Sequence, residues 1–309
     1  MTTTAGWRHV EHVMGTVVSI DVRDPRIPRT TLLSVLGWLH WVDATFSTYQ
    51  SDSAINRLSR GEIDIVDCPP EITEVLGLCA EITATTDGYF QATADGRLDP
   101  TGVVKGWAIE RAHEILVAAG SRAHLVTGGG DLRAHGEPSA EPRPWCIGIA
   151  DPHRPGELAA MVAGTDIAVA TSGTAERGGH IINPYTGRPA TDLASVSVIG
   201  PDLIHADAYA TAAVAMERID WLDDLGYSAF AIDSAGERRY TASCPVIEIA
   251  PQHRPSSGSS QDSFRCSTES GGTLRATDGA GTLRTVPPGQ EERDEIRARG
   301  RTTCQHDGS

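Results

Sequence analysis

The feature that most restricts what this chain can fold into is a change in composition close to residue 250. Residues 251–309 are rich in Ser, Gly, Thr and Arg and hold too few large apolar side chains to build a core. Their eight acidic and eight basic residues cancel, so the whole net charge of −15 belongs to residues 1–250. We therefore expect one folded domain over 1–250 and a disordered tail over 251–309. A short charged helix around 291–299, or an arm that folds on a partner, are the alternatives for the tail.

The charge balance excludes two classes of partner. A chain with 26 basic and 41 acidic residues would repel a polyphosphate backbone, so we expect no nucleic-acid binding. No apolar run reaches the roughly 18 to 20 residues that span a bilayer, so we expect no membrane insertion. The N-terminus shows no secretory leader pattern, and the six cysteines form no C-x-x-C pair, which together favour a cytoplasmic location. Lys105 is the single lysine of the chain.

Hydrophobic periodicity predicts helices early in the chain and strands later. Helices are predicted over residues 30–46, 51–60, 70–86, 100–119 and 204–217. Strands are predicted over residues 15–22, 124–127, 144–150, 158–163, 167–171, 194–199, 229–232 and 240–243. This order favours an α+β fold over a regular βαβ repeat.

The start of the helix over 100–119 is a candidate phosphate site. Asp99 stands where an N-cap belongs, and Pro100 stands at the first helical position, where its missing N–H costs nothing. Free N–H groups and the positive end of the helix dipole suit a phosphate, and Lys105 follows one turn later. The alternative is an ordinary cap with a solvated lysine.

Two loop segments carry residues that could act on a ligand. Three glycines in the segment 126–131 either let the backbone approach a ligand closely or form a simple turn. The segment matches neither a P-loop nor a dinucleotide fingerprint. In the loop over 170–187, His180 stands between glycine and isoleucine and could be a general base, a ligand contact or neither.

Asp207 and Thr211 are four residues apart, so they share one face of the predicted helix over 204–217. A carboxylate and a hydroxyl placed in this way can hold a hard cation. The alternative is a threonine bonded back to its own helix beside a solvated aspartate. The alanines around the pair favour close packing, so we expect Asp207 to be partly buried.

Taken together and in order, these segments resemble the FAD:protein FMN transferase family, also called the ApbE proteins. The resemblance covers roughly residues 10 to 245. The matching motifs are Met14-Gly-Thr16, Phe46–Leu58, Asp99–Gly106, Thr127–Asp131, Trp145–Pro152, Ala170–Gly173, His180–Gly187 and Ala206–Thr211.

The resemblance implies a twisted, mainly antiparallel sheet flanked by helices around a central FAD cleft. It implies an enzyme that moves FMN from FAD to a Ser or Thr hydroxyl of a target flavoprotein, with release of AMP and with Mg²⁺ as the required cation. Within enzymes, the alternative is an FAD pyrophosphatase that yields FMN and AMP. From another class, the alternative is a non-catalytic FAD-binding protein.

The resemblance also implies roles for individual residues. The catalytic residues would be His180, as the base that deprotonates the acceptor, and Asp207. The metal ligands would be Asp207, Thr211 and the backbone carbonyl of Gly102. The FAD site would be lined by Met14, Tyr49, Tyr89, Phe90, Gln91, Asp99, Lys105 and Ile181.

The sequence departs from the family pattern around the cleft. It is a short form, because the segment between Phe90 and the Asp99-Pro-Thr-Gly102 motif is shorter than in many members, and Gln91 replaces an expected Asp. Asn183 stands where an Asp is usual. These differences leave the metal and phosphate residues in place and concern the acceptor side. Since every other Lys or Arg position of the chain is Arg, the one lysine falling inside a phosphate-binding motif favours a functional Lys105.

Overall fold

The structure is a computed structural model that describes residues 6–94, 96–138, 143–174 and 181–248, with two short strands at 265–267 and 275–277. The chain divides into two compact units, Met1–Ser256 and Ser257–Ser309. In the second unit, β16 (Arg265–Ser267) pairs with β17 (Arg275–Thr277) in antiparallel fashion. The remainder of the predicted tail lies outside the described residues.

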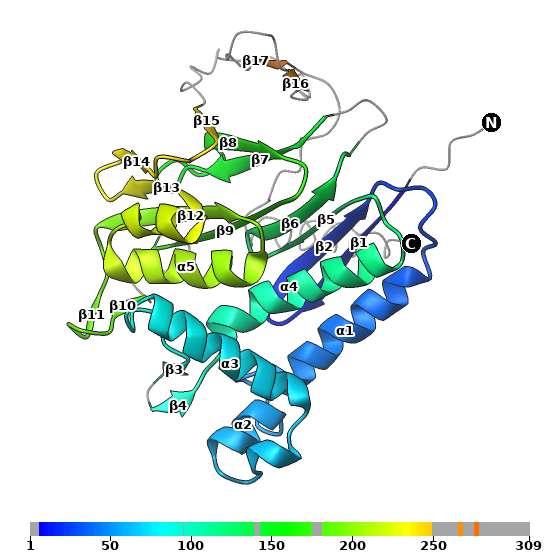
Figure 1. Cartoon of the computed structure of the whole chain (residues 1–309), viewed down its shortest axis with the longest axis vertical. Helices are drawn as coiled ribbons and strands as arrows, with labels where there is room; N and C mark the ends of the chain where they lie inside the picture. The colour runs from blue at the N-terminus through cyan, green and yellow to red at the C-terminus, as the bar shows by residue number, and fades with distance from the viewer. Residues whose placement is uncertain are drawn as a thin grey trace, which may run out of the picture. The chain divides into compact units, whose positions relative to one another are not determined.

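An eight-stranded sheet forms the centre of the first unit (Figure 1). Its strand order is β1-β2-β5-β6-β9-β12-β13-β14, and every pairing within it is antiparallel. The strands are β1 (Trp7–Val13), β2 (Thr16–Val22), β5 (Ala123–Gly128), β6 (Asp131–Gly136), β9 (Ile167–Gly173), β12 (Leu193–Gly200), β13 (Ser228–Asp233) and β14 (Arg238–Tyr240). The predicted α+β fold with a mainly antiparallel sheet is confirmed.

Smaller strand groups complete the unit. They are β3 (Thr93–Ala94) with β4 (Arg97–Leu98), β10 (Ile182–Asn183) with β11 (Arg188–Pro189), and β7 (Trp145–Ala150) with β8 (Leu158–Gly164) and β15 (Val246–Glu248).

The described helices lie on the same side of the main sheet, some packed on it and others packed on neighbouring helices. They are α1 (Thr31–Phe46), α2 (Ala54–Ser59), α3 (Pro70–Thr85), α4 (Thr101–Ala118) and α5 (Leu203–Met216), with 3-10 turns η1 (Ile65–Asp67) and η2 (Asp220–Leu225). Helices α4 and α5 lie side by side, α4 over β5 and β6 and α5 over β9 and β12 (Figure 1). Helices α1 and α3 both pack against α4. Within the described parts of the chain, no helix is both long and apolar enough to cross a bilayer.

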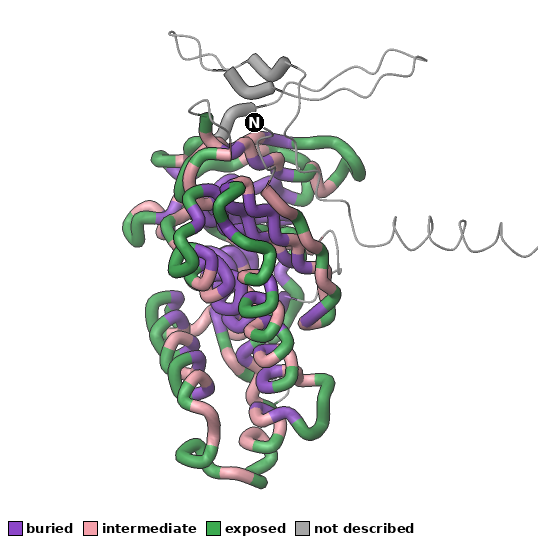
Figure 2. Tube along the Cα trace, turned by 90° about the vertical axis from the view of Figure 1, so that its right-hand side faces the viewer, coloured by how far each residue is buried: buried purple, intermediate pink, exposed green. Residues whose placement is uncertain are grey.

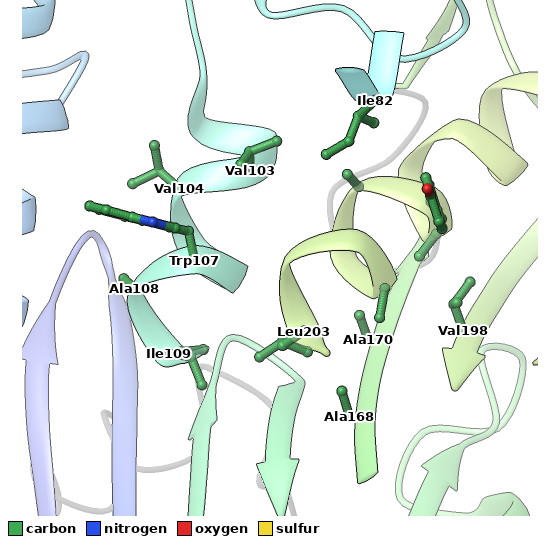
Figure 3. Close-up of a cluster of buried hydrophobic side chains, with 14 of the residues drawn as sticks. Ile82, Val103, Val104, Trp107, Ala108, Ile109, Ala168, Ala170, Val198 and Leu203 are labelled. Atoms are coloured by element: carbon green, nitrogen blue, oxygen red, sulfur yellow. The ribbon is translucent and has the colours of Figure 1, made fainter. Parts of the chain in front are cut away.

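The core lies between this helix layer and the sheet. Trp107 and Ile109 of α4, Leu203 of α5 and Val198 of β12 are fully buried there, as the close-up in Figure 3 shows. In Figure 2 the buried residues lie along the facing sides of helices and strands, while the outward turns are exposed. Each buried side chain of this size contributes about 1.5–3 kcal/mol relative to an exposed one, so this layer contact is the main stabilising feature of the unit.

Small residues bring α4 and α5 unusually close. A Cβ added at Gly106 would lie 2.6 Å from the carbonyl oxygen of Leu203 and 3.1 Å from the Cβ of Asp207. On the α5 side, Ala206, Ala208 and Ala210 are completely buried. The glycine therefore allows the helix contact that places Asp207 beside α4.

Most predicted elements are present, but two strands of the main sheet, β1 and β6, and several short strands outside it were not predicted. Every second residue of strand β1 is exposed to solvent (Arg8, Val10 and His12), and the strand forms one edge of the sheet. Strand β6 contains Arg133, whose charge is neutralised by Glu110 of α4 at 2.9 Å, a contact that periodicity does not reveal. The last strand was predicted too late, since β14 ends at Tyr240 rather than near residue 243.

Candidate active site

Two hairpin turns lie next to each other at one end of the main sheet. Met14 and Gly15 form the turn between β1 and β2, with φ angles of 56° and 67°. Gly129 and Gly130 form the turn between β5 and β6, with φ angles of 58° and 93°. A Cβ at Gly129 would lie 3.2 Å from Thr16 Oγ1, so the turns are in contact. Paired positive φ angles are typical of tight hairpin turns.

The triple-glycine segment therefore forms a turn, one of the two interpretations that its sequence allowed. It also leaves room for side chains of α4. A Cβ at Gly128 would lie 2.9 Å from Ile109 Cδ1, and a Cβ at Gly129 would lie 3.6 Å from Lys105 Cδ. The turn thus borders the stem of Lys105.

Lys105 ends between two buried aspartates. Its Nζ forms an ion pair with Asp131 Oδ2 and lies 3.5 Å from Asp207 Oδ1. The side chain of Lys105 is 30% exposed, whereas those of Asp131 and Asp207 are 0% and 5% exposed. The other oxygen of Asp131 accepts the backbone N–H of Thr171 at 2.9 Å. The interpretation of Lys105 as a solvated lysine is therefore wrong, while its predicted contact with FAD stays a prediction.

Burial and the neighbouring charges shift the pKa values of Lys105 and Asp207. Burial on its own lowers the pKa of Lys105, but the carboxylates of Asp131 and Asp207 more than offset it and raise that pKa above its ordinary value. Burial raises the pKa of Asp207, and the Lys105 charge opposes this rise. Lys105 is therefore cationic at neutral pH, and its charge favours the ionised form of Asp207.

One carboxylate oxygen of Asp207, like one of Asp131, is buried without a hydrogen-bond donor in the described part of the chain. In Asp207 this oxygen is Oδ2. One turn later, Thr211 Oγ1 lies 3.1 Å from Ser172 Oγ of β9. A buried carboxylate oxygen without a donor, beside a hydroxyl, is a fitting ligand set for a hard cation, which takes oxygen ligands and retains waters. The prediction that Asp207 is buried is confirmed, and the solvated alternative is wrong.

This ligand set is small. Among the described residues, no three His, Cys, Asp or Glu side chains converge as a metal site. A cation here would be held by few protein atoms, as is usual for Mg²⁺ that binds together with substrate phosphates.

The start of α4 differs by one residue from the prediction. The helix begins at Thr101, and Pro100 rather than Asp99 holds the N-cap position. Asp99 still serves the helix start, because its Oδ1 accepts the Thr101 N–H at 3.1 Å and the Thr101 hydroxyl at 2.6 Å. Gly102, in the first turn, lies against Phe90: an added Cβ would be 2.8 Å from the ring. Phe90 itself is 2% exposed and belongs to the core.

A pair of tyrosines joins two segments that the family motifs assign to the FAD site. The rings of Tyr89 and Tyr185 are 4.9 Å apart, and the Tyr185 hydroxyl donates to the carbonyl of Asp87. This contact connects the loop after α3 with the β10–β11 hairpin. Ile181, just before that hairpin, is buried in the core.

The remaining predicted residues are not drawn into the cluster. Tyr49 is 97% exposed in the loop after α1, and Gln91 is also exposed. His180 lies outside the described residues. Conversely, Asp131 was not predicted as a site residue. The available signal was an aspartate at the end of a glycine turn directly after a strand, but its pairing with Lys105 depends on a contact across 26 residues of sequence.

The arrangement corresponds to a known family. The family model described as the ApbE family matches residues 14–96 and 91–229, which is more than half of the chain. The chain belongs to the ApbE family. The match includes the two turns, the lysine cluster and the Asp207–Thr211 pair described above.

Individual relatives agree with this assignment. The chain is 32% identical over 173 residues to a FAD:protein FMN transferase of Rhodobacter capsulatus, covering 50% of this chain and 33% of that protein. It is 37% identical over 138 residues to a FAD:protein FMN transferase of Treponema pallidum, covering 39% and 38%. The matched segments thus span about a third of the length of these curated relatives.

Solved structures show the same fold. An ApbE protein of Thermotoga maritima aligns with a TM-score of 0.67 at 24% identity, covering 77% of this chain and 97% of that one. The flavin transferase ApbE of Vibrio cholerae aligns with a TM-score of 0.65 at 20% identity, covering 77% and 98%.

Proposed function

We propose that this protein is a Mg²⁺-dependent FAD:protein FMN transferase, which moves FMN from FAD to a Ser or Thr hydroxyl of a target flavoprotein and releases AMP. The observation that carries the proposal is the buried oxygen of Asp207 without a hydrogen-bond donor among the described residues. It lies where the family motifs converge, beside Thr211 and Lys105. The relatives named as FAD:protein FMN transferases support the same reaction.

The proposed cation ligands are Asp207, Thr211 and the carbonyl of Gly102. When bound, the cation would neutralise charge on the pyrophosphate oxygens and on the departing AMP. Lys105, the only lysine, is close enough to the same cluster to add a positive charge at the phosphates. The protein needs such help because residues 1–250 carry the whole charge of −15.

The reaction itself is a substitution at phosphorus. The acceptor hydroxyl oxygen forms a bond to the phosphorus of the FMN half, and the bond from that phosphorus to the bridging oxygen breaks. The bridging oxygen leaves with AMP, and the hydroxyl proton passes to the proposed base, His180. Tyr89, Phe90, Ile181 and Met14 are proposed to shape the flavin and adenine ends of the cleft.

The test uses the purified chain with FAD, Mg²⁺ and candidate acceptor flavoproteins. Covalent FMN on a Ser or Thr is detected by peptide mass spectrometry, and AMP is measured separately. Asp207→Asn should slow transfer by about 100-fold or more, since even outer-shell partners of metal ligands are worth roughly 10–100-fold. As a matched control, Asp220→Asn removes an exposed aspartate that forms an ion pair with Arg218, and this variant should transfer FMN at the parent rate.

The two alternatives predict other products. An FAD pyrophosphatase would release FMN and AMP without any acceptor, and a non-catalytic FAD-binding protein would release no AMP. Equal transfer rates for Asp207→Asn and the parent would refute the cation assignment. Transfer by His180→Ala at the parent rate would refute the proposed base.

A further inference from the structure

The buried cluster of Lys105, Asp131 and Asp207 is unequal in charge. Two carboxylates share one ammonium group, and both carboxylate side chains are at least 95% buried. Asp131 has both oxygens engaged, one in the ion pair with Lys105 and one by Thr171 N–H. Asp207 has the longer lysine contact, 3.5 Å from Nζ to Oδ1, and the Gly106 backbone also stabilises its charged form. Its Oδ2, like that of Asp131, is buried without a hydrogen-bond donor among the described residues. The ammonium group of Lys105 therefore lies closer to the carboxylate of Asp131 than to that of Asp207.

The three residues come from three separate elements. Lys105 belongs to α4, Asp131 begins β6, and Asp207 belongs to α5. Gly106 keeps α4 and α5 close, and Gly129 leaves room for the lysine stem. The position of the ammonium group is thus fixed by the same close contacts that create the proposed cation site.

A buried carboxylate is costly without a partner, and Asp207 lies beside an ammonium group that can compensate its charge before any metal ion arrives. Lys105 is the cationic group recorded within ion-pair distance of Asp207 in the described part of the chain. Lysine suits a temporary partner, because its ammonium group is a compact point charge on a flexible four-carbon stem. A divalent cation at Asp207 would repel Lys105 and take over its role there.

We propose that Lys105 is an internal counter-ion that competes with the divalent cation for Asp207, and that Asp131 limits this competition by holding the ammonium group. Cation binding ends the Lys105–Asp207 contact. Lys105 then keeps its ion pair with Asp131, and the side of its ammonium group that faced Asp207 can contact a phosphate. This inference rests on the cation ligands of the proposed function, but it does not require that FMN be transferred. It makes Lys105 a residue that sets cation affinity.

The central test measures binding of Mn²⁺ alone, by the loss of its free EPR signal, with no FAD or acceptor present. Lys105→Met removes the charge and keeps an apolar stem, so Mn²⁺ should bind roughly tenfold more tightly or better than to the parent. Asp131→Asn can still accept the Thr171 N–H, but it releases Lys105 to Asp207. Mn²⁺ binding should therefore weaken in that variant. The double variant should bind Mn²⁺ like Lys105→Met, because Asp131 acts through the lysine.

The control is the other buried ion pair of α4 and β6. Arg133 Nε lies 2.9 Å from Glu110 Oε1, with side chains 10% and 11% exposed. Arg133→Met also removes the cation of a buried pair, so it should lower the melting temperature without changing Mn²⁺ affinity. Added Mn²⁺ should restore the melting temperature of Lys105→Met and leave that of Arg133→Met at its lowered value.

Several results would overturn the inference. One is a folded Lys105→Met variant that binds Mn²⁺ no more tightly than the parent. Another is a Lys105→Met variant that stays unfolded at saturating Mn²⁺, because the ion should replace the ammonium group. Failure of the parent to transfer FMN would count against the proposed function and leave these binding results standing. Conversely, FMN transfer with unchanged Mn²⁺ affinity in Lys105→Met would count only against the counter-ion.

Discussion

Replacing Gly106 by alanine tests whether the close contact of α4 and α5 builds the site. In an isolated helix this change stabilises, because glycine is about 0.8–1.0 kcal/mol less favourable than alanine. Here the added Cβ would lie 2.6 Å from the Leu203 carbonyl oxygen, a backbone atom that can move only if α5 moves. Overpacking of this kind costs about 1–3 kcal/mol, and the contact with backbone argues for the upper end. We expect a net loss of about 2 kcal/mol.

The matched control is the same substitution at Gly37 in α1. Gly37 is exposed, and an added Cβ would meet no described atom within 4 Å. Gly37→Ala should therefore gain about 1 kcal/mol. For a domain of this size 1 kcal/mol shifts the melting temperature by about 2–4 °C, so the two variants should move in opposite directions by a readily measured amount.

A second readout separates a local effect from a general one. The new methyl group would also lie 3.1 Å from the Cβ of Asp207, so Gly106→Ala should weaken Mn²⁺ binding as well as lower the melting temperature. Gly37→Ala should leave Mn²⁺ binding unchanged. A Gly106→Ala variant that melts above the parent and binds Mn²⁺ normally would refute the idea that this glycine positions Asp207.

Three further predictions concern other parts of the chain. Burial lowers the pKa of His113 to about 4 and that of His124 to about 3, whereas histidines of the unfolded chain bind protons near pH 6.5. The free energy of unfolding, measured by urea denaturation, should therefore fall as the pH drops from about 6.5 towards 4 and should show no such loss between pH 7 and 8. Tyr185→Phe keeps the ring on Tyr89 and should bind FAD more tightly than Tyr185→Ala, measured by quenching of flavin fluorescence, with equal affinities contradicting a role for the ring. Removal of residues 257–309 should leave the melting temperature of the first unit unchanged by calorimetry, and a fall of several degrees would show that these residues stabilise it.

Elements whose signal is local were predictable from the sequence. The helix predicted over 30–46 is α1 at Thr31–Phe46, because its buried residues recur at helical spacing. The helix predicted over 204–217 is α5, one residue longer at its start and one shorter at its end, and Asp202 caps it by accepting the His205 N–H. In both cases, the information lies within the segment itself.

Elements that depend on partners far away in the sequence were not predictable in this way. Strand β6 reads as a polar segment because Arg133 and Asp131 interrupt it, yet Arg133 is neutralised by Glu110 and Asp131 by Lys105. Each partner lies on α4, more than twenty residues earlier in the chain. A prediction from hydrophobic periodicity uses only the polarity of each residue. Whether a charged residue can be buried depends on a partner that is brought near it by folding.

The two buried ion pairs of α4 differ in how completely the acidic partner is hydrogen-bonded. Glu110 has both oxygens satisfied, one by Arg133 Nε at 2.9 Å and the other by the Leu203 N–H at 2.8 Å. Arginine, with its fixed planar fork, suits such a permanent contact. Asp207 is left with an oxygen that no described residue satisfies, and its cation is the only lysine in the chain. Both oxygens of Glu110 have hydrogen-bond donors, so this pair stabilises the fold as it stands. The oxygen of Asp207 that has no donor leaves a place for another cation. The only lysine of the chain therefore lies at the pair that the proposed cation would complete.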